Sequence, residues 1–122
     1  MTQNYKTPVY LSIDPSGTGT TCIFNGEIFV NIKSKNWEVH LQEIYKYISV
    51  VLNQENIKLE AVFLENIKSA YNNQNKDIIP LIKLIGSIES YLNYEIRNNY
   101  PFKIINITSD QTKRIAKWWK QR

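Results

Sequence analysis

The stretch that most constrains this chain covers residues 9–24 and reads VYLSIDPSGTGTTCIF. Apolar and polar residues alternate over residues 9–13, a period of two that is typical of a strand with one buried face. This strand ends in a carboxylate, Asp14. The small residues that follow predict a turn, and residues 20–24 predict a second strand running back beside the first. A carboxylate beside such a turn suits a metal ion that holds a phosphate, or a phosphate held by backbone N–H groups, although Asp14 as a simple turn cap explains the same pattern.

The rest of the chain alternates between helical and strand patterns. Asn25-Gly26 favours a hairpin turn, and Ser34 or Asn36 supplies a helix cap. We expect strands over 9–13, 20–24 and 27–32, a helix over 37–53, a strand over 59–65, a helix over 78–96, a strand over 102–107 and a last helix over 109–122. This order predicts a single α/β domain over residues 1–122. Its mixed five-stranded sheet has three antiparallel strands followed by two parallel ones, with helices on both faces.

The composition is that of an ordinary soluble domain, with 43% hydrophobic and 21% charged residues. No apolar run approaches the roughly 18 residues of a membrane span, and the polar start does not read as a signal peptide. We therefore expect a cytoplasmic protein with no membrane partner. The single cysteine, Cys22, is expected to be a reduced, buried thiol. The single histidine, His40, is expected at the surface or boundary of its helix.

The positive charge gathers at the end of the sequence. Residues 109–122 hold five of the 15 basic residues and one of the 11 acidic ones, so the net charge of +4 comes from this segment. Such a segment tracks phosphates, while a solvated helix face explains the same cluster. Trp118 and Trp119 lie among the cations, where they suit stacking on unpaired bases, while packing of one in the core with the other left bare explains them equally well. The residues expected to contact nucleic acid are Lys113, Arg114, Lys117 and Lys120.

Apolar residues cover more than one side of the helix expected over residues 78–96. One side is expected to pack on the sheet and another to meet a partner, with Gly86 allowing close approach. This pattern predicts a homodimer formed through this helix, while burial of that side under the basic C-terminal segment explains the same pattern.

Two carboxylates are expected to meet in the sheet. The strands over 9–13 and 59–65 are expected to be parallel neighbours, and they end in Asp14 and Glu65. Adjacent carboxylates repel each other unless a cation lies between them, and Mg²⁺ prefers a partial carboxylate shell completed by phosphate oxygens. The pair predicts a Mg²⁺ or Mn²⁺ site suited to phosphodiester hydrolysis. The alternative is that Glu65 is an ordinary acid at a strand end.

These motifs resemble the first two active-site motifs of the RuvC-like Holliday junction resolvases, within the RNase H-like superfamily. The resemblance rests on Ile13-Asp14-Pro15-Ser16-Gly17 and on Leu64-Glu65-Asn66-Ile67. Residues 83–86 resemble part of that family's second helix, and residues 102–117 resemble its fifth strand and the start of the next helix. The similarity covers almost the whole chain.

The resemblance implies a metal-dependent endonuclease that acts on branched DNA as a homodimer, with Mg²⁺ or Mn²⁺ as cofactor. Asp14 and Glu65 take the place of metal-binding catalytic acids. Asp110 takes a catalytic position because other members of the superfamily place an acid near the start of the last helix, although an acid there also offsets the helix dipole. Thr21 stands where the family has a glycine. The family's remaining acids lie beyond the point where this sequence stops, so we expect a C-terminally shortened member that binds junctions better than it cuts them.

Two other functions fit the same residues. The turn after Asp14 also resembles the phosphate loop of the sugar kinase and actin-like superfamily, whose similar sheet binds ATP. That family needs a second domain and a second phosphate loop, and this length contains neither. The third function is a non-catalytic DNA-binding or dimerisation module derived from the nuclease fold. Comparing the binding of a four-way junction with the binding of ATP separates the nucleotide-binding function from the other two. Cleavage of the junction in Mg²⁺ or Mn²⁺ separates the nuclease from the non-catalytic module.

Overall fold

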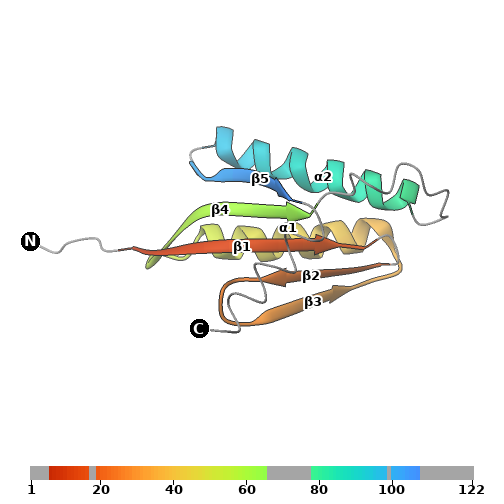
Figure 1. The fold of residues 1–122 in the computed structure, drawn as a ribbon, viewed down its shortest axis with the longest axis horizontal. Coiled ribbons are helices and arrows are strands. Elements are labelled where there is room, and N and C mark those ends of the chain that lie inside the picture. Colours follow the sequence, from red (N-terminus) through yellow and green to blue (C-terminus); the bar gives the residue numbers. More distant parts are fainter. Residues whose placement is uncertain (1–5, 17–18, 66–77, 99, 108–122) are drawn as a thin grey trace, which may run out of the picture.

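A computed structural model describes residues 6–16, 19–65, 78–98 and 100–107 of the chain. Figure 1 shows the arrangement of the helices and strands within these ranges. They are β1 (Thr7–Pro15), β2 (Thr20–Phe24), β3 (Phe29–Lys33), α1 (Trp37–Leu52), β4 (Ile57–Glu65), α2 (Ile78–Arg97) and β5 (Lys103–Ile107). Their order and types are those predicted from the sequence. The last predicted helix, over residues 109–122, lies outside the described residues.

The strands form one five-stranded sheet in the order β3-β2-β1-β4-β5. β2 pairs antiparallel with β1 and with β3, whereas β4 pairs parallel with β1 and with β5. The prediction of a mixed sheet, with an antiparallel half followed by a parallel half, is therefore confirmed. β1 lies in the middle, where the two halves meet (Figure 1).

Both described helices pack on the same face of the sheet, which we call the inner face. Leu11 of β1, Ile44 of α1 and Ile88 of α2 are buried in one hydrophobic cluster. The helices also contact each other, since the rings of Tyr45 and Tyr91 stack with centroids 4.2 Å apart. The opposite, outer face carries neither described helix. The expectation of helices on both faces is thus not met by α1 and α2, because both cross the sheet on one side to share a single apolar layer.

Local side-chain chemistry sets where the third strand and the first helix begin. The Asn25 side chain accepts hydrogen bonds from the N–H groups of Glu27 and Ile28. This extends the hairpin loop, so β3 begins at Phe29 and not at residue 27 as predicted. At the start of α1, the Asn36 side chain accepts a hydrogen bond from Val39 N at 3.1 Å. Of the two predicted caps, Asn36 is therefore the one that is used.

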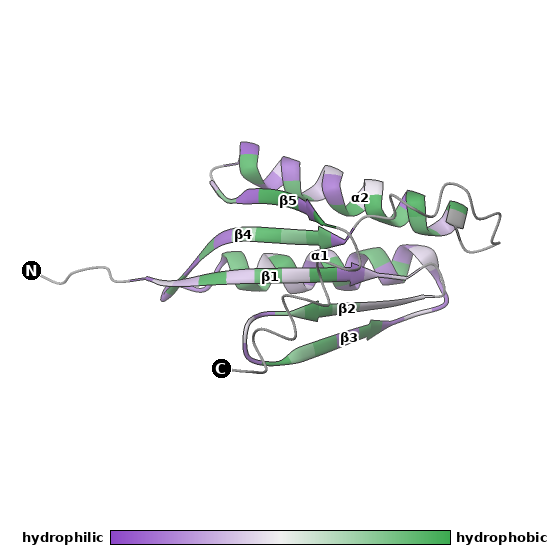
Figure 2. Cartoon of the chain, in the orientation of Figure 1, coloured by the Kyte–Doolittle hydropathy of each residue, from purple (hydrophilic) through white to green (hydrophobic). Residues whose placement is uncertain are grey.

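Hydropathy follows this layered arrangement. Figure 2 shows hydrophobic and hydrophilic bands alternating along both helices, as expected where one side of a helix packs on a sheet. Among the described segments, no helix combines the length and apolar character needed to cross a membrane.

Two glycines are expected to respond to alanine in opposite directions. Gly86 lies exposed in α2, and a Cβ there would meet no atom within 4 Å, so Gly86→Ala should raise the free energy of unfolding by about 0.5–1 kcal/mol. Gly19 has φ +91°, and its Cβ would lie 2.6 Å from the carbonyl oxygen of Ser34. Gly19→Ala should lower the free energy of unfolding by more than about 1 kcal/mol. Urea unfolding of the monomeric protein measures both, and a destabilised Gly86→Ala would contradict the open surroundings of Gly86.

Candidate functional site

The parallel pairing of β1 with β4 brings two carboxylates to neighbouring positions. Ile13 pairs with Leu64, so Asp14 and Glu65 are the next residues along the two strands. Neighbouring strands lie about 4.8 Å apart, and paired residues of parallel strands point to the same face. Ile13 and Leu64 are buried on the inner face. Asp14 and Glu65 therefore share the outer face, at the carboxyl ends of adjacent strands.

A bulge in β4 sets this pairing. The register shifts by one residue early in the two strands, which leaves Glu60 as an extra residue in β4. Had the first register continued, Asp14 would lie beside Leu64, and the pair would no longer match two acids. A slip of one residue exchanges the faces of a strand, so Glu65 would then oppose the inward-facing position of β1. The alignment of Asp14 with Glu65 thus depends on one extra residue near the other end of β4.

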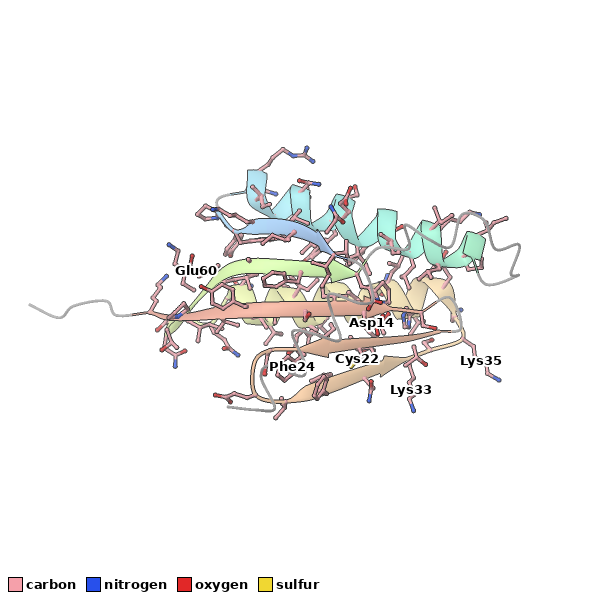
Figure 3. All side chains as sticks on the ribbon, viewed as in Figure 1. Asp14, Cys22, Phe24, Lys33, Lys35 and Glu60 are labelled. Atoms are coloured by element: carbon pink, nitrogen blue, oxygen red, sulfur yellow. The ribbon has the colours of Figure 1, made fainter. Side chains whose placement is uncertain are left out.

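A row of polar residues continues across the outer face from this carboxylate pair. Asp14 pairs with Cys22, and Cys22 pairs with Asn31. Figure 3 shows Asp14 and Cys22 close together on adjacent strands. Cys22 is half-buried, so the prediction of a buried thiol is wrong in degree, because residue 22 faces outward on β2. Burial, and to a lesser extent the charge of Asp14, raise the pKa of the Cys22 thiol, which keeps it protonated and a poor nucleophile or metal ligand at neutral pH.

The two carboxylates on the outer face can supply only part of the ligands that a metal ion needs. Among the residues that the structure describes, no group of three or more His, Cys, Asp or Glu side chains is arranged to hold a metal ion. Mg²⁺ is usually bound by one or two carboxylates, with water and phosphate oxygens completing its shell. Asp14 and Glu65 fit that smaller requirement. The other predicted site residues, Asp110, Lys113, Arg114, Lys117 and Lys120, lie outside the described residues.

A separate cleft of about 400 Å³ opens where the β1–β2 turn meets the starts of both described helices. The backbone fixes one wall, because Ser34 N donates a hydrogen bond to Gly19 O at 2.9 Å. This contact joins the turn to the segment before α1. The side chains that matter for its chemistry are Ser16, Lys35, Trp37, His40, Pro80 and Leu84.

His40 lines this cleft and was not expected there. It is only 2% exposed, so the prediction of a surface or boundary position is wrong. Its Nε2 lies 2.7 Å from the hydroxyl of Thr21, which is fully buried in β2. His40 is buried because this bond gives its imidazole a polar partner inside the apolar layer. The sequence held one signal for it, because the hydroxyl of an inward-facing Thr21 requires a hydrogen-bond partner.

The second ring nitrogen of His40 has no such partner. Its Nδ1 is buried without a hydrogen bond in the described part of the chain. A buried polar atom left unpaired costs about 1–3 kcal/mol, and such atoms are rare in folded proteins. Burial also lowers the pKa of the imidazole, so the ring is neutral at neutral pH. His40, which lines the cleft, therefore carries a neutral, buried ring nitrogen that forms no hydrogen bond with the described residues.

Comparisons with known proteins add no identity to these observations. No protein-family model, curated protein or solved structure matches this chain. The proposals for its function therefore rest on its residues and their geometry.

Protonation of His40 is expected to destabilise the fold. Its pKa lies below the ordinary value of 6.5, so the unfolded chain takes up a proton first as the pH falls. The contribution of neutral His40 should be complete above pH 6.5 and should decline below it, by up to about 1.4 kcal/mol per pH unit, until the folded pKa is reached. Urea unfolding across this range should show a shallower decline for His40→Leu. An equal decline in both proteins would contradict the assignment, and NMR titration of this single histidine gives its folded pKa directly.

Proposed function

We propose that this chain is a RuvC-like, metal-dependent endonuclease domain with an RNase H-like fold, acting on branched DNA. The observation that carries the proposal is the register of β1 with β4, which sets Asp14 and Glu65 side by side on the outer face. The strand order β3-β2-β1-β4-β5 supports it, because this is the mixed sheet expected for that superfamily. The acids of the two motifs, Asp14 and Glu65, are thus neighbours on adjacent strands.

The residues of the pair have a direct chemical role in this proposal. Asp14 is exposed and can approach a DNA backbone from the outer face. Asp14 and Glu65 would hold Mg²⁺ or Mn²⁺ through their carboxylate oxygens. When bound, such an ion activates a water molecule and offsets the charge that develops on the phosphate. Lys33, exposed at the end of β3, supplies a cation near the same end of the sheet for a neighbouring phosphate (Figure 3).

We expect the chain to bind junction DNA better than it cleaves it. Hydrolysis with two metal ions requires carboxylates that hold both ions about 3.5–4 Å apart. Asp14 and Glu65 suffice for one ion, and Asp110 is the acid that the sequence offers for a second. A non-catalytic DNA-binding module remains the alternative if the second ion is never held.

A homodimer is part of the proposal, since two sites are needed to cut two strands of a junction. The exposed side of α2 supports a homodimer. Ile79 and Ile82 are 65% and 38% exposed on that side, and Gly86 follows on the same side with open space around its Cα. A small residue beside exposed apolar side chains lets a second helix approach closely.

The metal proposal is tested by Mn²⁺ binding. Asp14→Asn and Glu65→Gln should each weaken Mn²⁺ binding at least tenfold, because each removes one of two charged ligands. Glu60→Gln is the matched control. Glu60 lies on β4 near the end of the sheet away from Asp14 (Figure 3) and pairs with Lys58 at 3.7 Å. Equal Mn²⁺ affinity in all four proteins, measured by titration calorimetry, would refute the metal site.

Cleavage of a four-way junction in Mg²⁺ or Mn²⁺ tests the catalytic acids. We expect slow cleavage by the wild type, none by Asp14→Asn, and loss in Asp110→Asn if Asp110 holds the second ion. Robust cleavage that survives Asp110→Asn would contradict the incomplete site. Junction binding without cleavage in either metal favours the non-catalytic module, and binding of ATP in place of a junction favours the sugar kinase and actin-like alternative.

Self-association is tested by sedimentation. The wild type should sediment as a dimer at about 100 μM, a concentration suited to an interface with a micromolar dissociation constant. The double variant Ile79→Lys, Ile82→Lys should sediment as a monomer, because two buried charges would face each other across the interface. Tyr94→Lys, exposed near the other end of α2, is the control and should remain dimeric. A monomeric wild type would remove the dimer from the proposal.

A further inference from the structure

The cleft beside the β1–β2 turn is distinct from the carboxylate pair. Asp14 lies on the outer face of β1, whereas His40 and Leu84 are buried in the helical layer on the inner face. Both features lie at the carboxyl end of β1, but on opposite sides of the sheet. The cleft therefore needs an explanation of its own.

His40 determines what kind of group the cleft accepts. Its Nε2 is held by the Thr21 hydroxyl at 2.7 Å, so the ring cannot turn without losing that bond. Its Nδ1 is buried and has no partner among the described residues. Because the ring is neutral, it suits a neutral donor or acceptor on a ligand better than a phosphate oxygen.

The other walls of the cleft suit a flat, apolar ring. Trp37, Pro80 and Leu84 supply apolar side chains, and Trp37 is 40% exposed, so part of this residue is accessible to a ligand. Lys35, exposed, supplies a cation where the segment before α1 meets the cleft, and Figure 3 shows it projecting outward at that end of the molecule. A volume of about 400 Å³ is in the range of small-molecule pockets and too small for a duplex.

We propose that this cleft binds one unstacked nucleotide of a DNA strand. The base stacks on Trp37 with its polar edge toward the His40 ring, while its phosphate lies toward Lys35. This inference rests on the proposed function, because branched DNA supplies unpaired nucleotides next to the junction. Its role is to capture a single-stranded nucleotide on the inner side, while the carboxylate pair meets the backbone on the outer side.

The single histidine of the chain makes the inference testable by NMR. In protein carrying ¹⁵N-labelled histidine, titration with dTMP or dAMP should shift the Nδ1 signal of His40. Deoxyribose 5-phosphate and inorganic phosphate, which lack the base, should leave that signal unchanged. An unmoved Nδ1 signal at millimolar nucleotide would overturn the inference, as would an equal shift with deoxyribose 5-phosphate, which would indicate an anion site.

Variants at the walls of the cleft separate stacking from charge. Trp37→Leu should weaken dTMP and dAMP binding about tenfold, the lower part of the range for base stacking on an aromatic side chain. Lys35→Ala should weaken binding less and reduce its salt dependence. Tyr94→Leu and Lys46→Ala, exposed residues away from the cleft, should bind as the wild type does. Equal loss in the controls and in the cleft variants would overturn the assignment of the site.

Parallel measurements keep this inference distinct from the proposed function. Junction binding that fails in the wild type while dTMP still shifts His40 contradicts the nuclease proposal and supports the nucleotide cleft. Junction binding that persists without any nucleotide shift contradicts the cleft alone. ATP binding more than tenfold tighter than dAMP binding would also overturn the inference, because it would place a triphosphate and not a DNA nucleotide at the β1–β2 turn.

Discussion

The parallel pairing of β1 with β4 is the constraint on which the rest of the structure depends. Two parallel neighbours cannot be joined by a tight turn, so the chain must return across the sheet between them. The segment from β3 through α1 makes that return and covers the inner face. The same pairing places the carboxyl ends of both strands together, where each carries an acid. Fold and candidate metal site are therefore consequences of one interaction.

The two faces of the sheet have different chemistry because only one of them packs against the described helices. Among the buried residues that the structure describes, the inner face is apolar apart from the Thr21–His40 pair. The outer face carries the row from Glu65 through Asp14 to Cys22, together with Phe24 and Phe29, whose rings stack with centroids 4.4 Å apart. The outer face thus combines acids with an aromatic pair in which Phe29 is exposed and Phe24 is half-buried.

Sequence periodicity predicted the elements well because alternation and helical spacing are local signals. Periodicity could not predict three features of the structure. The extra residue at Glu60 changes the register of a strand without changing its pattern, and the Asn25 side chain delays β3 through hydrogen bonds that its residue type only permits. His40 was misplaced because its burial depends on Thr21, nineteen residues earlier in the chain. The convergence of Asp14 and Glu65 was predictable in outline from strand order, whereas the bulge that aligns them was not.

The hydrogen bond between Thr21 and His40 connects the two candidate sites physically. Thr21 pairs with Pro15, the residue directly after Asp14. Its hydroxyl is bonded to a ring near the start of α1, and Gly19, two residues earlier, is bonded to Ser34 just before that helix. The start of β2, which pairs with the end of β1, is thus held to His40 of α1 and to Ser34 before that helix. A ligand that contacted His40 in the inner cleft would therefore contact a residue bonded to the segment that positions Asp14. The inner cleft and Asp14 on the outer face thus depend on the same short segment.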